Sequence, residues 1–167
     1  TACLVSRYDY KEEMPMNPQA LEQYLHEHIP LSQTMQVSVI KAGEEMVILS
    51  APLAPNINHT ETVFGGSASA VAILAAWSII HVRLKNAGMA GSIVIQSNIM
   101  SYERPIYGTF TARSFIAPPE AWEVFMRTLL RRGRARIEVS SVLEYENQPV
   151  GSFEGKFVAI GINSTMQ

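Results

Sequence analysis

The feature that most constrains this sequence is one long segment that is apolar on every face of the helix it predicts. Helical character runs from Gly65 to about Asn86, and Gly88 ends it. Between Ala68 and Val82, twelve of the fifteen residues are apolar. A helix that is apolar all round has to be buried on all sides. The remainder of the chain must therefore wrap around this segment.

The segments on either side of it supply strands and two shorter helices. Asn17 is a good N-cap, Pro30 is a helix stop, and residues 135–145 alternate between apolar and polar as a half-buried strand does. The other elements that we expect are helices over 17–29 and near 119–131, a hairpin over 35–53, and strands over 93–102, 108–116 and 150–162. The predicted fold class is α+β, with a curved antiparallel sheet wrapped around a central helix at about 65–87.

Length and composition fit one domain with a buried interface. A chain of 167 residues is expected to form about one domain, which we place at residues 17–163, with residues 1–16 as an N-terminal extension. Charged residues make up 17% of the chain and apolar residues 47%, whereas about a quarter of an ordinary soluble domain is charged. This excess of apolar surface predicts a homodimer or a dimer of dimers.

The same numbers argue against several classes of protein. A net charge of −2 disfavours a nucleic-acid partner. The single cysteine, Cys3, can form neither an internal disulfide nor a cysteine-rich zinc site, and we predict no metal site and no cofactor. The most apolar window, residues 68–82, is shorter than the roughly 18 residues that cross a bilayer. We therefore expect no membrane partner and a cytoplasmic location.

Two stretches of the sequence resemble motifs of the hot-dog fold acyl thioesterase superfamily. Residues 58–67 read NHTETVFGGS, which is similar to an Asn, a six-residue gap and a Gly-Gly pair that opens the central helix. Residues 98–113 are similar to the strand, Arg-Pro, Gly and strand stretch of the same superfamily. More narrowly, the chain resembles the thioesterase domain that some bacterial proteins carry behind an acetyltransferase-like domain, which would account for a chain that starts at Thr1.

This resemblance implies a hydrolase of acyl-coenzyme A or acyl carrier protein thioesters. Unpaired N–H groups at a helix start favour negative charge, so Gly65 and Gly66 are the candidate oxyanion hole. The simpler alternative is that the glycines only allow a tight turn into the helix. Asn58 matches the family Asn that binds the thioester or orients the attacking water, although it could also be a turn residue.

Four neighbouring residues are further candidates. His59 could act as a general base, and Glu61 could replace a missing acid. Active relatives often carry Asp or Glu on the helix about two turns after Gly-Gly, but here that region has no carboxylate, and Ser69 is its polar side chain. Phe64 stands where many relatives have His and would contact the acyl chain. The plainer alternatives are that His59 is an ordinary loop histidine, that Glu61 is a solvated loop acid, and that Ser69 is a serine in the first turn of the helix.

Basic residues gather around Gly133. Five of the thirteen lie within ten positions: Arg127, Arg131, Arg132, Arg134 and Arg136. Arginine near a helix C-terminus often has only a capping role. The alternative is a landing site, centred on Arg132 and Arg134, for the phosphates of coenzyme A or for an acidic acyl carrier protein, because Arg binds phosphate bidentately.

Two functions therefore stay open at the level of sequence. One is an acyl-thioester hydrolase, for which a coenzyme A thioester is a substrate and not a cofactor. The other is a non-catalytic module that binds an acyl thioester or dimerises within a larger acyltransferase-type protein, and the absent helix carboxylate favours it. Dehydration or isomerisation is disfavoured, because it needs a His paired with an acid on the long helix.

Overall fold

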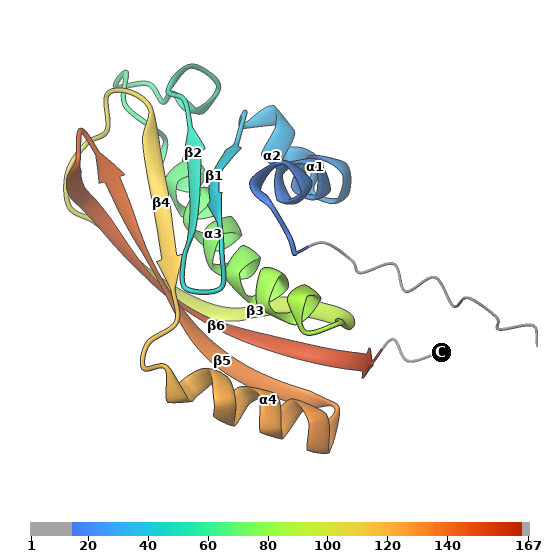
Figure 1. Cartoon of the computed structure of the whole chain (residues 1–167). Helices are drawn as coiled ribbons and strands as arrows, with labels where there is room; N and C mark the ends of the chain where they lie inside the picture. Colours follow the sequence, from blue (N-terminus) through green and yellow to red (C-terminus); the bar gives the residue numbers. More distant parts are fainter. Residues whose placement is uncertain (1–14, 165–167) are drawn as a thin grey trace, which may run out of the picture.

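The protein folds as a six-stranded antiparallel sheet that curls around one long helix (Figure 1). The computed structural model describes residues 15–164, with side chains up to residue 161. The expected extension over residues 1–16 and Cys3 therefore fall almost entirely outside the described residues. The helices are α1 (Pro18–His28), α2 (Pro30–Thr34), the 3-10 helix η1 (Ala54–Asn56), α3 (Gly65–Asn86) and α4 (Glu120–Arg132). The strands are β1 (Ser38–Ala42), β2 (Val47–Ala51), β3 (Met89–Tyr102), β4 (Phe110–Phe115), β5 (Arg134–Tyr145) and β6 (Gln148–Ser164).

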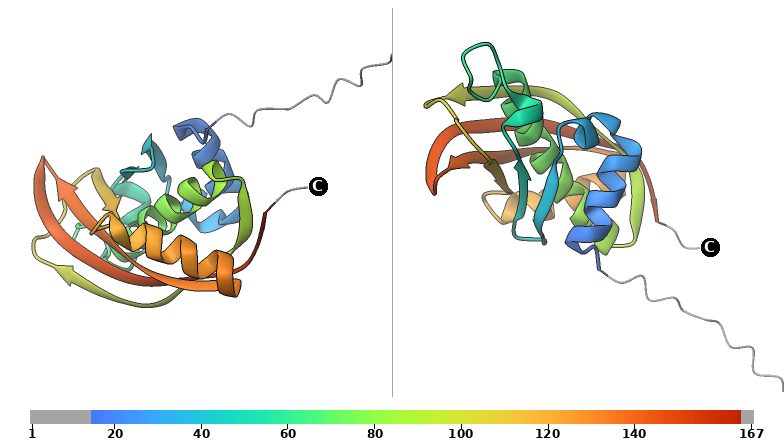
Figure 2. Two further views of the ribbon diagram at one scale, coloured as in Figure 1. Left: turned by 60° about the horizontal axis from the view of Figure 1, so that its bottom comes forward. Right: turned by 90° about the horizontal axis from the view of Figure 1, so that it is seen from above.

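The central helix α3 lies in the concave side of the sheet. The strands follow the order β1-β2-β4-β5-β6-β3, and Figure 2 shows the sheet bending around α3. Two buried serines fix the helix to the sheet by polar contacts: Ser114 Oγ donates to the carbonyl of Ala75 at 2.6 Å, and Ser141 Oγ donates to the carbonyl of Ala72 at 3.0 Å. This arrangement confirms the predicted α+β class with an antiparallel sheet around a central helix.

Within one chain, α3 is not covered along one stripe. Gly66 is exposed, and Ala70, Ile73 and Trp77 are only half-buried. These residues fall on one face of the helix because they recur at intervals of three and four. Tyr24 of α1 stacks near Trp77, with 6.0 Å between ring centroids, and so covers only the later part of the stripe. The N-terminal part of the stripe has no such cover from the described residues.

By length and composition alone, α3 could cross a membrane. Residues 68–82 alone are too short, but the whole helix has 22 residues and an 18-residue window of mean hydropathy 1.5, which is long and apolar enough. Its position decides instead, because 61% of that window is buried inside the protein. α3 is therefore a core helix.

Several element boundaries differ from the predicted ones, and two of these differences change how the chain connects its elements. Pro30 does more than end α1, because it also opens α2, where its missing N–H is tolerated. β3 begins at Met89, earlier than the predicted start at Ile93. Gly88 takes a left-handed conformation with φ 67°, which turns the chain directly from α3 into this strand.

α4 packs on β5 and meets the C-terminal end of α3. Phe125 and Leu129 form its buried face. The guanidinium of Arg83, in the last turn of α3, lies 5.0 Å from the centre of the Trp122 ring, a cation–π contact. The N-terminal end of α3 therefore lies away from α4.

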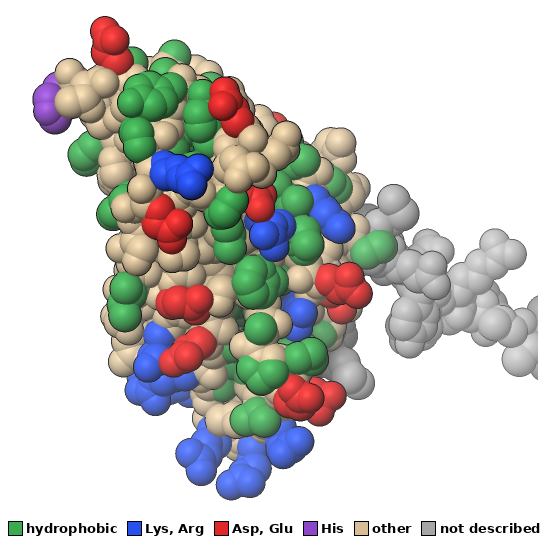
Figure 3. All heavy atoms as spheres, turned by 90° about the vertical axis from the view of Figure 1, so that its left-hand side faces the viewer, with side chains coloured by type: hydrophobic (Ala, Val, Ile, Leu, Met, Phe, Trp, Pro, Cys, Tyr) green, Lys and Arg blue, Asp and Glu red, His purple; other side chains and the backbone are tan. Residues whose placement is uncertain are grey.

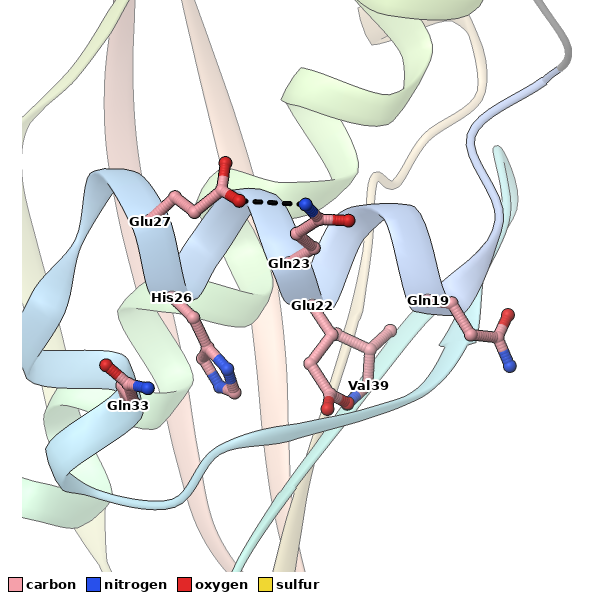
Figure 4. Close-up of a pocket in the computed structure, with 7 residues that line it drawn as sticks. All are labelled: Gln19, Glu22, Gln23, His26, Glu27, Gln33 and Val39. Carbon is pink, nitrogen blue, oxygen red and sulfur yellow. Dashed lines mark hydrogen bonds between the residues drawn. The ribbon is translucent and has the colours of Figure 1, made fainter.

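The two outer strands of the sheet are treated differently. From α1, Glu22 accepts a hydrogen bond from the N–H of Val39 at 2.8 Å, and His26 Nε2 donates to the carbonyl of Val37 at 2.8 Å. Figure 4 shows Glu22 of α1 beside Val39. We call this side of β1 the covered edge. β3 is the other outer strand, and no other strand in the described part of the chain pairs with its free side, which we call the open edge.

Candidate active site

A buried asparagine fixes the loop that leads into α3. Asn56 is 1% exposed, and its amide donates to the carbonyls of Met35 at 3.0 Å and Pro52 at 2.7 Å. The backbone carbonyl of Asn56 accepts from the N–H of Phe64 at 2.7 Å. The residue just before α3 is therefore held in place from the interior. Sequence reasoning missed Asn56, because in sequence it is one of several polar residues in a Pro- and Asn-rich loop.

The start of α3 presents unpaired backbone donors. Helix geometry leaves the N–H groups of Gly65, Gly66 and Ser67 without an acceptor in the helix, and no other group within residues 15–164 accepts from them. The N-cap residue, Phe64, makes no side-chain capping bond. Donors of this kind at the positive end of a helix dipole can hold a developing oxyanion.

The two glycines differ in how much room they leave for a side chain. Tyr102 Oη donates to the carbonyl of Gly65 at 3.1 Å, and a Cβ at position 65 would lie 3.4 Å from the Tyr102 ring, an ordinary contact. A Cβ at Gly66 would instead overlap the ring of Phe64. Phe64 is 56% exposed beside these donors, where we expected a contact with the acyl chain.

The side chain of Asn58 is occupied by its own loop. Its Oδ1 accepts from the N–H groups of Thr60 at 2.9 Å and Thr62 at 3.2 Å, and its Nδ2 lies 3.0 Å from Thr62 Oγ1. A backbone bridge between Ile57 and Val63 closes the same loop. Asn58 therefore organises the turn that leads toward Gly65.

The remaining catalytic candidates do not converge within one chain. His59 and Glu61 are exposed on the turn that Asn58 closes, and neither side chain bonds to another described residue. Glu61 has a φ of 60°, in the left-handed region. Ser69 is half-buried one turn into α3, and its hydroxyl has no hydrogen-bond partner in the described structure.

The basic residues lie at the other end of the molecule. Arg132 ends α4 and Arg134 starts β5, and both are exposed. Lys and Arg side chains gather at the lower end in Figure 3, which is where α4 lies in Figure 1. Because α3 has 22 residues, its two ends are about 33 Å apart. Within one chain, the arginines and Gly65 are therefore on opposite sides of the fold.

The start of α3 lies beside a cavity. No group of three or more His, Cys, Asp or Glu side chains that could hold a metal ion occurs in residues 15–164. A cavity of about 320 Å³ opens beside Gly65, with Tyr102 and Arg104 among its lining residues. The site thus combines backbone donors with an adjoining space.

The fold and this helix start together define a class of protein: the hot-dog thioesterase class, in which an antiparallel sheet wraps a central helix that begins at a glycine pair. Residues 18–161 match the family described as "Putative thioesterase (yiiD_Cterm)". The chain belongs to this family.

Solved structures agree with this assignment. A protein of unknown function from Chlorobaculum tepidum is 28% identical, with a TM-score of 0.81 over 87% of this chain and 98% of that one. A "putative thioesterase" from Shewanella oneidensis is 25% identical, with a TM-score of 0.76 over 86% and 96%. The Escherichia coli PaaI protein of the phenylacetic acid degradation operon is 15% identical, with a TM-score of 0.63 over 86% and 94%, and shares the fold.

Proposed function

We propose that this protein hydrolyses acyl thioesters at the start of α3. Water adds to the thioester carbonyl carbon, and the N–H groups of Gly65 and Gly66 hold the resulting oxyanion. The C–S bond then breaks, and the products are a carboxylic acid and a thiol that takes up a proton. The observation that carries this proposal is the set of unpaired N–H groups at the start of α3. The buried Asn56 holds this helix start in place through its hydrogen bonds to Met35 and Phe64.

Polar groups of the loop before α3 would position the attacking water and accept its proton. Asn58 is engaged with Thr60 and Thr62, so its role would be to hold the loop or, after releasing Thr62, to position the water. His59 and Glu61 are free to act as base when a second subunit brings them to a site. Ser69 is close enough in sequence to the donors to orient a water on α3.

A homodimer would complete this site. β3 has 14 residues, none of them charged, and its free side has no strand partner among residues 15–164. Long uncharged edges of this kind invite pairing with another strand. Antiparallel pairing of two β3 strands would place the Tyr102 end of one beside the Met89 end of the other. The basic end with Arg132 and Arg134 on one copy would then approach the start of α3 on the other, where it could receive coenzyme A phosphates or an acidic acyl carrier protein. Such a dimer, free or in pairs, would act in the cytoplasm.

The second candidate is a non-catalytic module that binds an acyl thioester or dimerises within a larger acyltransferase-type protein. The observation that favours it is the stretch of α3 over residues 70–76, which holds only Ala, Val, Ile and Leu and so no carboxylate. Tight binding of acyl-coenzyme A without turnover would distinguish this module from a hydrolase.

Removing a single backbone donor tests the hydrolase. Gly65 is the first residue of α3, where proline fits a helix, and Phe64 has the extended conformation (φ −59°, ψ 130°) that precedes proline well. Gly65→Pro deletes the N–H, whereas Gly65→Ala keeps it and adds a tolerated Cβ. Across a panel of acyl-coenzyme A and acyl carrier protein thioesters, we expect Gly65→Pro to lose about 100- to 1,000-fold in kcat relative to Gly65→Ala.

Equal rates for these two variants would show that the Gly65 N–H is not an oxyanion donor. No turnover by the wild-type protein on any thioester of the panel would exclude the hydrolase and leave the binding module.

A further inference from the structure

The cavity beside Gly65 has a floor made only of buried apolar side chains. Val63, Ala68, Leu143 and Val150 contribute to this floor and are 8%, 2%, 1% and 3% exposed. Four different elements meet here, because these residues come from the loop before α3, from α3 itself, from β5 and from β6. A ligand group that enters so deep finds no polar side chain from these residues and must be apolar.

The mouth of the same cavity differs in character from its floor. Tyr102, Glu103 and Arg104 line it and are exposed. The rim therefore accommodates the polar part of an amphipathic ligand, while the floor accommodates the apolar part.

Gly65 belongs both to this cavity and to the row of unpaired donors. A carbonyl held at the start of α3 would therefore have its substituents next to the cavity, and the apolar acyl substituent matches the apolar floor. We propose that this cavity binds the acyl chain and limits its length, with Val63 and Ala68 as the residues that set the limit. This inference rests on the proposed function, because it needs the thioester carbonyl at Gly65.

The size of the cavity sets the class of acyl group. A water-sized group occupies about 30 Å³, and a methylene is of similar size. The volume of about 320 Å³ therefore corresponds to about ten heavy atoms. The preferred substrates are then short and medium acyl chains, because the rest of a long fatty acyl chain would lie outside the cavity in water.

Two substitutions that change the cavity in opposite directions test this inference. For straight-chain acyl-coenzyme A substrates from acetyl to myristoyl, we expect kcat/KM to rise about fourfold for each methylene until the cavity is full. Ala68→Leu adds three carbons to the floor and should shorten the preferred chain by about three, whereas Val63→Ala should lengthen it by about two. Val47→Ala is the matched control, because Val47 is fully buried on β2 and does not line the cavity.

Chain-length profiles that shift in opposite directions in the two variants, and not in the control, support the inference. Turnover with unshifted profiles, or with the same shift in Val47→Ala, overturns it and leaves the hydrolase intact. If no thioester is hydrolysed, the proposed hydrolase fails, and binding of non-hydrolysable acyl-coenzyme A thioethers becomes the readout. Affinities that follow chain length and shift with the two variants then support the cavity, and affinities independent of chain length overturn it.

Discussion

The two outer strands of this sheet meet solvent in opposite ways. β1 has five residues, and α1 occupies two of the nearby backbone groups with the side chains of Glu22 and His26. β3 has 14 residues without a charge, and it exposes large apolar side chains, with Ile99 at 73% and Val94 at 49%. Natural proteins cover, shorten or charge their edge strands to prevent pairing. The covered edge follows that rule and the open edge does not, and this difference is the basis of the pairing proposed for β3.

The same contrast orders the rest of the molecule. The C-terminal half of α3 is covered by α1 through a cluster of rings. The centroid of the Tyr24 ring lies 4.4 Å from that of His81, which lies 4.7 Å from that of Trp77. The N-terminal half carries the unpaired donors, and Ala70 and Ile73 there are only half-buried. The chain thus closes the half of the fold near the covered edge and leaves the candidate active site next to the uncovered stripe.

Charging the open edge should have the largest effect. In the double variant Val94→Lys/Ile99→Lys, like charges would meet across an antiparallel pair of β3 strands and oppose pairing. We expect sedimentation to show a dimer for the wild-type protein and a monomer for the variant at micromolar concentration. Ile40→Lys is the control, because Ile40 is 59% exposed on the covered edge. A monomeric wild-type protein, or a double variant that stays dimeric, would contradict the proposal that two chains pair through the open edge.

Uncovering β1 should cost less but still be easy to measure. Glu22→Ala leaves the N–H of Val39 without its charged acceptor, and hydrogen bonds to charged groups contribute about 2 kcal/mol. We expect the free energy of unfolding in urea to fall by about that amount, and turbidity to appear as the bared strand pairs between molecules. Gln23→Ala, which breaks the exposed bond from Gln23 to Glu27 on the same helix, should change stability by less than about 0.5 kcal/mol. Similar losses in both variants would contradict a specific covering role for Glu22.

Acid should loosen the cover of β1 through His81. Burial lowers the pKa of His81 from 6.5 to about 4, with smaller contributions from Lys85 and His28. Neutral His81 is favoured in the folded state, so protonation of this ring opposes folding. The contribution of His81 to the free energy of unfolding is therefore complete above pH 6.5 and is lost as the pH falls toward 4. Since the ring is only partly buried, solvent screening reduces the loss to about 1–2 kcal/mol.

Unfolding measured at pH 7, 5.5 and 4 checks this expectation. His81→Gln should flatten the dependence on pH in that window, and His59→Gln, on the exposed loop, should leave it unchanged. An unchanged slope in His81→Gln would assign the acid sensitivity to another group.

The smallest effect is expected where the open edge meets the candidate active site. Tyr102→Phe removes the bond from Tyr102 Oη to the carbonyl of Gly65, but Tyr102 is 57% exposed. We expect a loss of about 0.5 kcal/mol, seen as a fall in Tm of about 1–2 °C. Tyr107→Phe is the control, because Tyr107 is 59% exposed and donates no side-chain hydrogen bond to a described residue. A larger fall in Tyr102→Phe would mean that this bond also holds the end of β3 in place.

The sequence predicted elements well where one local pattern decides the structure. The helix over Gly65–Asn86 and the strand over Arg134–Tyr145 match the expected ranges closely. Periodicity and glycine placement are properties of neighbouring residues, so they are readable without the fold. The glycine pair at a helix start was readable for the same reason, and it lies within residues 18–161, which match the thioesterase family.

Other features depended on residues that are distant in the chain. Nothing near Asn56 indicates that its amide will reach Met35, 21 positions away. The same is true of Glu22, whose carboxylate meets Val39 only because α1 folds back along β1. Which stripe of α3 stays uncovered within one chain also depended on distant residues, because a single sheet and one short helix cannot surround a cylinder completely.

The sequence by itself determined that a long apolar helix must be wrapped and that a glycine pair opens it. Only the tertiary structure decided which strand lies at each end of the sheet, which of those two edges is covered, and where the cavity opens beside Gly65. The physical reason is that local patterns fix how each segment hides its own apolar face. Edges and cavities arise between segments, from the order in which the strands pair and from what that order leaves unpaired.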